Sequence, residues 1–176
     1  MIRIAATTTL LLCATTLFAN PVKESGIQGG LVVSIGNLES LEELRLNDRY
    51  LVQGLSTDAA AVAEARAKLQ KKGVYGPVSV KLFDGKTLPY VDNTVNGVVV
   101  SGFRFQVSGE EIERVLAPGG TLVCEKNLTP DTRHLTPQSP AAKHRWNCFT
   151  KPVPPEIDEW THFLHGPDNN AVAEDI

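Results

Sequence analysis

The sequence has few cysteines, and no two of them have the spacing of a metal or redox site. Three cysteines occur in 176 residues, and the absence of a Cys-x-x-Cys motif argues against zinc-finger and thioredoxin-like chemistry. Lysines and arginines do not cluster, and the formal net charge is −3, which argues against a nucleic-acid partner. Gly-x-Gly-x-x-Gly and Gly-x-Ser-x-Gly are also missing, which argues against a nicotinamide dehydrogenase and a serine hydrolase.

Residues 1–19 have the pattern of a secretory signal peptide. Arg3 precedes an apolar, threonine-rich run that ends in Leu17-Phe18-Ala19, a small-residue cleavage site. The run is too short for a stable membrane span. In a lipoprotein signal the cysteine follows a small residue, whereas Cys13 follows Leu12. We therefore expect cleavage after Ala19 and export to the periplasm or the extracellular space.

Export would leave two cysteines, Cys124 and Cys148, in the mature chain. Outside the cytosol the two could form a disulfide. Alternatively, Cys124 is an inert packed thiol, because it lies in an apolar run that predicts a buried strand.

Strand-like and helical patterns alternate from residue 31 onward. An alternating or continuous apolar pattern predicts each strand. Capping residues predict where the helices start. The first helix would start after Asn37 or Ser40, the second after Thr57 or Asp58, and the third after Ser108, which has Glu111 in capping-box spacing. Pro118-Gly119-Gly120 ends the last helix. The expected strands are residues 31–36, 50–55, 78–82, 95–100 and 121–124, and the expected helices end near residues 48, 72 and 118.

This alternation predicts an α/β fold, with a Rossmann-like, doubly wound and mostly parallel sheet of about five strands. The expected domain spans residues 26–126. Residues 127–156 carry six prolines and little periodicity, which indicates a surface excursion or linker. Residues 157–176 form a separate tail.

Two motifs resemble the second half of a class I S-adenosylmethionine-dependent methyltransferase domain. Phe-Asp-Gly-Lys-Thr-Leu-Pro-Tyr-Val-Asp-Asn, residues 83–93, leads into the strand at 95–100, and Arg-Val-Leu-Ala-Pro-Gly-Gly, residues 114–120, leads into the next strand. The family sheet usually has two more strands beyond this point. At most one, around residues 146–150, fits the proline-rich segment, so we expect a truncated version of the fold.

The resemblance implies S-adenosylmethionine as the cofactor. In that family an acidic residue after the third strand faces the adenine, which corresponds to Asp84 and its neighbour Gly85. The glycine-rich first turn is reduced to Gly36, and the acid expected after the second strand is replaced by Ser56, with Asp58 two residues later. Asp58 also suits a helix N-cap, and Asp84 also suits a tight turn.

The first turn departs from the family pattern at two further positions. Ser34 stands where an acid is usual, and Leu38 places a branched side chain where a glycine would let the cofactor approach. We therefore expect a degenerate cofactor site with low affinity for S-adenosylmethionine.

The tail resembles the opening segment of quinoprotein-like (PQQ-like) β-propellers, with Trp160 ahead of a Gly-Pro-Asp-Asn turn. His162 and His165 have a spacing that shares a helix face, with acids nearby, but no third ligand is specified. We therefore expect no metal site, and the sequence indicates no catalytic residue.

Two functions follow from these patterns. The first is an exported methyltransferase-like domain, weakly active or inactive, with an unidentified methyl acceptor. The alternative is a non-catalytic scaffold, the front part of a PQQ-like β-propeller protein, with an envelope protein as partner.

Overall fold

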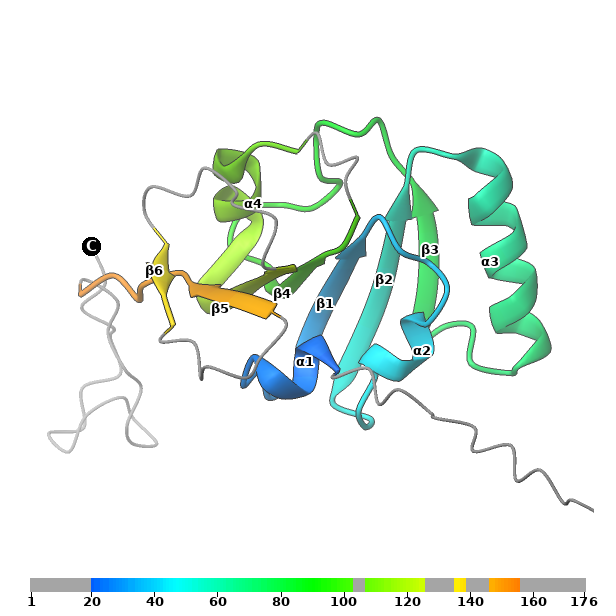
Figure 1. Ribbon diagram of the computed structural model, residues 1–176, viewed down its shortest axis with the longest axis horizontal. Coiled ribbons are helices and arrows are strands. Elements are labelled where there is room, and N and C mark those ends of the chain that lie inside the picture. Colours follow the sequence, from blue (N-terminus) through cyan, green and yellow to red (C-terminus); the bar gives the residue numbers. More distant parts are fainter. Residues whose placement is uncertain (1–19, 103–106, 126–134, 139–145, 156–176) are drawn as a thin grey trace, which may run out of the picture.

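The computed structural model describes residues 20–102, 107–125, 135–138 and 146–155. They form one seven-stranded sheet in the order β3-β2-β1-β4-β5-β7-β6 (Figure 1). Five strands are mutually parallel: β1 (Gly30–Ile35), β2 (Tyr50–Ser56), β3 (Val78–Leu82), β4 (Val95–Val100) and β5 (Leu116–Glu125). The predicted α/β fold with a mostly parallel sheet is confirmed, although the sheet has seven strands rather than about five.

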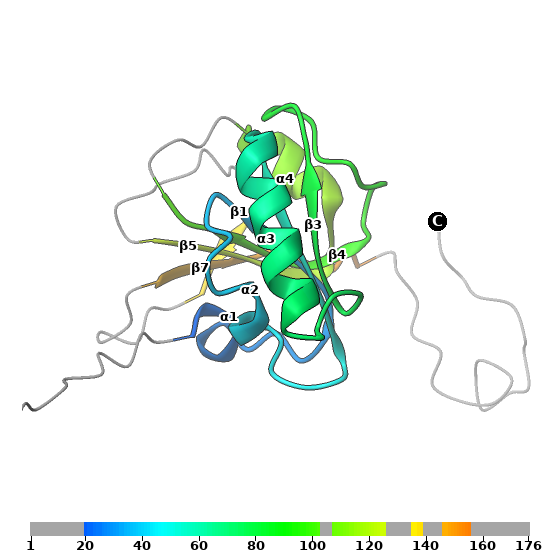
Figure 2. The same cartoon turned by 90° about the vertical axis from the view of Figure 1, so that its right-hand side faces the viewer.

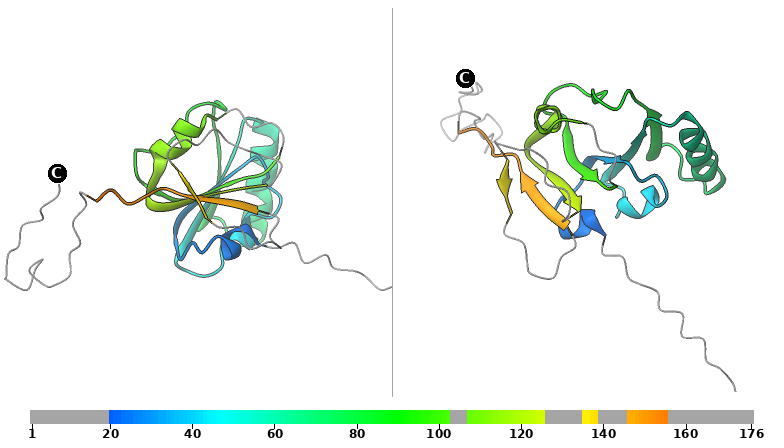
Figure 3. Two further views of the ribbon diagram at one scale, coloured as in Figure 1. Left: turned by 60° about the vertical axis from the view of Figure 1, so that its left-hand side comes forward. Right: turned by 45° about the horizontal axis from the view of Figure 1, so that its top comes forward.

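Two antiparallel strands continue the sheet beyond β5 (Figure 3). They are β7 (Trp146–Thr150), which pairs with β5, and β6 (Thr136–Pro137), which pairs with β7. The expectation of at most one strand here is wrong, and the segment expected to be a linker contributes to the sheet. A two-residue strand containing proline has no sequence signal, and proline is tolerated in β6 because β6 is an edge strand.

The helices cover the two faces of the sheet unequally (Figures 1 and 2). The helices α1 (Pro21–Glu24), α2 (Leu41–Leu44) and α3 (Ala59–Lys71) pack on one face, through a core that includes Val32, Val99 and Val123. The helix α4 (Gly109–Val115) packs on the other, with Val33, Val98 and Leu122. Adjacent strand residues thus point to opposite faces, as expected for a sheet buried on both sides.

Two of these helices differ from the sequence expectation. The helix predicted to end near residue 48 is a single turn that stops at Leu44, and Arg45 then turns to donate to the carbonyl oxygen of Tyr50. The helix α4 ends at Val115 rather than at Pro118, because β5 already pairs with β4 from Leu116 across an irregular register.

The two cysteines lie on opposite faces of the sheet. Cys124 is fully buried in the core that α4 covers, and Cys148 packs against the core on the other face. Neither forms a disulfide, and burial raises the pKa of the Cys124 thiol to about 12. The packed-thiol interpretation is confirmed for Cys124, and a bond between the two is excluded by the alternation of the strands.

In the part of the chain that the structure describes, no helix has the length and apolar character needed to cross a membrane.

Candidate functional site

The carboxyl ends of the five parallel strands meet at one edge of the sheet. Ile35 at the end of β1 lies beside Leu55 of β2 and Val100 of β4, and Ser56 lies beside Leu82 of β3. The strand order reverses between β1 and β4. In open α/β sheets ligands bind outside the carboxyl ends at such a switch point, so a ligand would meet the predicted residues at this edge.

Gly36 follows β1 directly and has a φ of +101°, which favours glycine. A Cβ atom at this position would overlap the carbonyl oxygen of Ser101, which follows β4. The glycine is therefore required by the close approach of the chain's own backbone. The structure thus places Gly36 at the switch point, but the space beside its Cα is filled.

Leu38 is half-buried and packs on the sheet face. A Cβ atom added at Gly54 would lie 2.7 Å from the Cδ2 atom of Leu38. The same Cβ atom would lie 2.5 Å from the Cδ1 atom of Leu41. The two leucines together cover Gly54 of β2. Leu38 is thus part of the core, and its replacement by glycine would leave a cavity rather than only open the first turn.

Ser56 and Asp58 both bind backbone groups at the start of α3. The hydroxyl oxygen of Ser56 accepts a hydrogen bond from the N–H of Asp58 at 3.1 Å. The Oδ1 atom of Asp58 accepts from the N–H groups of Ala60 and Ala61 at 2.8 and 3.3 Å. Asp58 is therefore the N-cap of α3, which is the structural alternative that the sequence left open.

Asp84 and Gly85 form a tight turn after β3. The Oδ1 atom of Asp84 accepts from the N–H groups of Lys86 and Thr87, both at 2.8 Å, and these hydrogen bonds lower the pKa of the exposed carboxyl group. Gly85 is buried with a φ of +85°. The predicted residues thus gather at the ends of β1, β2 and β3, and each of the two carboxylates has one oxygen bound to its own turn.

Arg114 binds the loop that precedes β4 to the helix α4. Its Nε and Nη2 atoms donate to the two carboxylate oxygens of Glu111 at 2.8 and 2.7 Å, and its Nη1 atom donates to Asp92 at 2.6 Å and to the carbonyl oxygen of Tyr90 at 3.0 Å. Glu111 also accepts from the N–H of Leu88 at 2.7 Å. The two motifs of the sequence resemblance therefore bind each other and hold the loop in place.

This network explains why the predicted capping box at Ser108 is only half formed. The Ser108 hydroxyl accepts from the N–H of Glu111 at 3.2 Å, but the Glu111 carboxylate binds Arg114 and Leu88 instead of returning to Ser108. The hydrogen bonds from Arg114 contribute most to the lowered pKa of Glu111.

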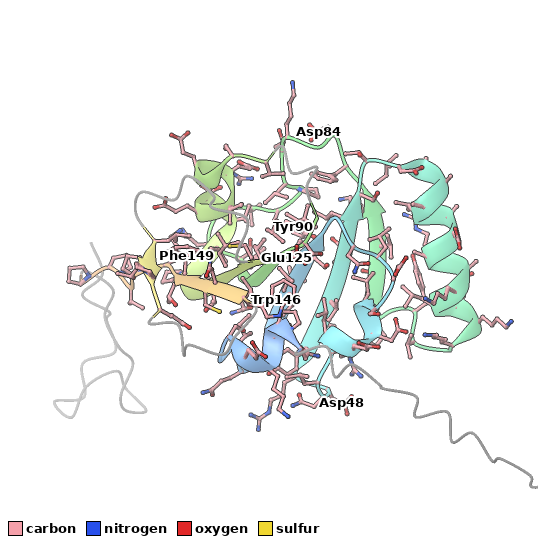
Figure 4. All side chains as sticks on the ribbon, in the orientation of Figure 1. Asp48, Asp84, Tyr90, Glu125, Trp146 and Phe149 are labelled. Carbon is pink, nitrogen blue, oxygen red and sulfur yellow. The ribbon has the colours of Figure 1, made fainter. Side chains whose placement is uncertain are left out.

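Tyr90 connects the loop that precedes β4 to strand β2 of the sheet. Its hydroxyl group donates to the Oε1 atom of Gln53 at 2.5 Å, and the Nε2 atom of Gln53 donates to Ser79 at 3.0 Å. The ring is half-buried against the core (Figure 4), and burial raises the pKa of the phenol. Tyr90 is therefore a neutral positioning group on the sheet, unsuited to act as a base.

A cavity of about 310 Å³ lies between α1, α2 and the ends of β1, β4 and β5. None of the five predicted site residues lines it. Its polar lining includes Ser34, Asn37, Glu43, Ser101, Glu125 and Trp146. Glu125 and Trp146 are cross-strand partners on β5 and β7 and lie beside each other in Figure 4. Sequence reasoning missed this site because it depends on the short α2 and on the pairing of β7.

A second cavity, of about 530 Å³, lies at the opposite edge of the sheet. It is lined by the segment that enters β1, by Asn96 and by Gly119 and Gly120. This edge holds the amino ends of the parallel strands, so the cavity lies away from the switch point. Among the described residues no group of three metal-ligating side chains occurs; His162 and His165 lie outside them.

A family model described as a methyltransferase domain matches residues 31–124, more than half of the chain. No curated protein sequence matches the chain.

Solved structures of similar fold include a putative S-adenosylmethionine-dependent methyltransferase from Methanococcus maripaludis. It is 19% identical, with a TM-score of 0.54 over 60% of this chain and 54% of that protein. A geranyl diphosphate methyltransferase in complex with S-adenosylmethionine is 16% identical, with a TM-score of 0.56 over 68% and 64%. The cyclase SpnF is 22% identical, with a TM-score of 0.52 over 62% and 46%. The chain thus spans less than two thirds of each of these proteins, and at these identities the likeness concerns the fold.

Proposed function

Because the chain belongs to the methyltransferase domain family, we propose that it is a methyltransferase-like domain that binds S-adenosylmethionine weakly, at the carboxyl ends of β1, β2 and β3. Family membership supports the ligand, and so does the geranyl diphosphate methyltransferase that holds it. The cyclase SpnF has a similar fold, so the fold alone does not fix the reaction.

One observation supports the reduced affinity: the predicted contact groups form hydrogen bonds with the backbone of their own cap or turn. Asp58 caps α3, Asp84 caps its own turn, and Ser56 offers a hydroxyl where the resemblance implies a carboxylate. A neutral hydroxyl gives a weaker hydrogen bond to a ribose than a carboxylate gives. These residues fit the cofactor only in part.

Calorimetric titration with S-adenosylmethionine tests this function. We expect weak binding by the wild type and tighter binding by Ser56→Asp, by about tenfold to a hundredfold, since a hydrogen bond to a charged group contributes roughly 1.5–3 kcal/mol. Thr57→Asp is the matched control, because it adds the same charge at the exposed neighbouring position. In the Ser56→Asp background, Asp84→Ala should remove the gain.

Two outcomes would contradict the proposal. Tight binding by the wild type would show an intact site that uses other contacts. No binding by either protein, both well folded, would favour the second candidate function.

The second candidate is a non-catalytic scaffold at the front of a PQQ-like β-propeller protein. The supporting observation is that β7 is the last described strand before the tail. Lys151, directly after β7, then anchors the chain. Its Nζ atom donates to Asn93 and to the carbonyl oxygens of Glu113 and Leu116, at 2.7, 2.7 and 2.9 Å. The resemblance of residues 157–176 to a propeller's opening segment supports an envelope protein or a further domain as the partner.

Export is also part of the proposed function. The signal-peptide pattern of residues 1–19 supports it, and so does the position of Asn20. The Asn20 side chain accepts hydrogen bonds from the N–H groups of Val22 and Lys23 at 3.0 and 3.3 Å, which makes it the N-cap of α1. Cleavage after Ala19 would therefore leave the first helix of the domain with its cap.

A further inference from the structure

Strand β3 forms one edge of the sheet, on the side of α3 (Figure 1). Its odd-numbered residues bind β2; the N–H of Phe83, for example, donates to the carbonyl oxygen of Ser56 at 3.1 Å. Successive residues of a strand direct their backbone groups to opposite sides. The N–H and C=O groups of Val78, Val80 and Leu82 therefore point away from the sheet. Such a row of outward groups is a template for a further strand.

The turn that precedes β3 closes the first of these positions. The N–H of Val78 donates to the carbonyl oxygen of Val74 at 3.2 Å, and its own carbonyl oxygen accepts from the N–H of Gly76 at 3.3 Å. Both backbone groups of Val78 are thus occupied within the chain, and a further strand could not bind them without breaking the turn.

Arg66 of α3 closes half of the next position. Its Nε and Nη2 atoms both donate to the carbonyl oxygen of Val80, each at 3.0 Å. Among the described residues, the N–H of Val80 and both backbone groups of Leu82 have no hydrogen-bond partner. Loss of Arg66 would therefore leave two outward-facing residues, Val80 and Leu82, able to pair completely with a further strand.

The same edge of a second copy is a partner that fits these two residues. In an antiparallel pairing with two-fold symmetry around Lys81, Val80 lies opposite Leu82 of the partner subunit, and the two exchange both N–H···O bonds. The reciprocal pair does the same. The Leu82 side chain is 46% exposed, so this pairing would also cover apolar surface.

Lys81 opposes this pairing. Its side chain is exposed, and the two-fold symmetry would place it directly opposite Lys81 of the partner subunit, with roughly 4.5 Å between the Cα atoms. Like charges at directly opposite positions destabilise a strand pair. Lysine at an edge strand is one of the ways in which proteins avoid pairing between sheets.

We propose that the carboxyl half of β3 is a surface for self-association through a continuous sheet, and that Arg66 and Lys81 hold it closed. Arg66 occupies the acceptor that a second copy needs, and Lys81 repels the same residue of that copy. The inference goes beyond the proposed cofactor binding and does not depend on it, because neither residue is among the predicted cofactor contacts.

The mass of the protein in solution, measured by sedimentation, tests this inference. Arg66→Met combined with Lys81→Thr should self-associate about tenfold or more tightly than wild type, because it frees the Val80 acceptor and removes the repulsion. Arg66→Ala in place of Arg66→Met is the second variant and should give the same result, since alanine suits a helix. Lys23→Thr combined with Arg49→Met is the matched control, because it removes two exposed charges of the same sign away from β3.

Disulfide formation tests the register of the pairing. The natural accessible thiols are first removed by Cys13→Ser and Cys148→Ser, while Cys124 is buried. In the Arg66→Met background, Lys81→Cys should then form a reducible covalent dimer under mild oxidation, because its Cα separation of roughly 4.5 Å lies within the range of a disulfide. Ser79→Cys lies on the same face of β3 but would be roughly 13 Å from its counterpart along the strands, so it should not cross-link.

Circular dichroism and the melting temperature verify that each variant is folded, and thiol labelling verifies that both introduced cysteines are accessible. Three results would overturn the inference: folded variants of Arg66 and Lys81 that associate no more than wild type, a control that associates as strongly as they do, or equal cross-linking through both cysteines. Cross-linking of Lys81→Cys that is as efficient with Arg66 in place would also overturn it, because Arg66 would then not close the edge.

Discussion

Arg114 and Glu111 face each other one helical turn apart on α4 and form a two-pronged ion pair, with N–O distances of 2.8 and 2.7 Å. The pair is only partly exposed, with 32% of the Arg114 side chain and 16% of the Glu111 side chain accessible. Because both groups also bind the loop of residues 88–92, the pair fixes the connection between β3 and β4. Arg114 and Glu111 thus hold the two motifs of the sequence resemblance together.

Replacing Arg114 by lysine should destabilise the fold. Lysine cannot reproduce the two parallel hydrogen bonds to Glu111 while also reaching Tyr90 and Asp92. We expect a loss of about 1–3 kcal/mol, which corresponds to a fall in melting temperature of roughly 2–12 °C for a domain of this size. Arg49→Lys, at an exposed position before β2, is the control and should change little. An unaltered melting temperature in Arg114→Lys would show that the network contributes nothing to stability.

The same pair predicts a loss of stability in acid. The pKa of Glu111 in the folded chain lies below its ordinary value of 4.5, chiefly because Arg114 donates to its carboxylate. A carboxyl group with a lowered folded-state pKa stabilises the fold above its unfolded-state pKa, and this contribution is lost as the pH falls through the folded-state pKa. We expect the stability advantage of wild type over Glu111→Gln, measured by urea unfolding, to be constant above about pH 5 and to shrink below pH 4.5. A difference that does not change with pH would contradict this assignment.

Two glycines at the same edge of the sheet form a matched pair for a strain test. Gly36 and Gly102 have φ values of +101° and +98°, so alanine is strained at both. A Cβ atom at Gly36 would overlap the carbonyl oxygen of Ser101, whereas one at Gly102 would meet nothing within 4 Å.

Gly102→Ala should therefore cost only the backbone strain, about 1–2 kcal/mol. Gly36→Ala should cost more, by a further amount of about 1–3 kcal/mol, because β1 and β4 must move apart. Denaturant unfolding of both variants measures the difference. Equal costs would show that the chain relaxes around Gly36 and that space for a ligand opens there easily.

Local patterns predicted the central sheet well, because Val95–Val100 and Val78–Leu82 carry their own strand signals. Local patterns could not decide between two uses of the same side chain. Asp58 suited both a cofactor contact and a helix N-cap, and Asp84 both a cofactor contact and a tight turn; their hydrogen bonds to Ala60 and Lys86 show the cap and the turn.

Features that depend on distant partners were not predictable from the sequence. Glu111 had capping-box spacing, but its carboxylate binds Arg114 and Leu88. Trp146 meets Glu125 only because β7 pairs antiparallel with β5 across 20 intervening residues of low periodicity. The cavity that they line was therefore invisible before the fold was known.

The N-terminus of the mature protein should lie at or near Asn20. Residues 1–19 have the signal-peptide pattern, and Asn20 caps α1 and also donates to the carbonyl oxygen of Glu43 in α2. Mass spectrometry of protein from the native envelope fraction measures the start. An intact Met1 on protein found in the cytoplasm would contradict both cleavage and export. Asn20→Ala should cost about 1 kcal/mol or more, through loss of the cap and of the hydrogen bond to Glu43.

Lys151 should mark the last point at which the chain contributes strongly to the stability of the α/β domain. Its Nζ atom binds Asn93 and the last carbonyl groups around the end of α4, and its backbone pairs with Gly119 and Gly120 of β5. Lys151→Met keeps the length and apolar stem but removes three hydrogen bonds, so we expect a loss of about 1–3 kcal/mol. Truncation after Pro155 removes the tail but keeps these contacts, and should shift the melting temperature by less than about 4 °C. If truncation costs as much as Lys151→Met, the tail packs on the domain and is not the opening of a separate propeller. If truncation is neutral and Lys151→Met is not, the domain ends at this anchor, as the scaffold hypothesis requires.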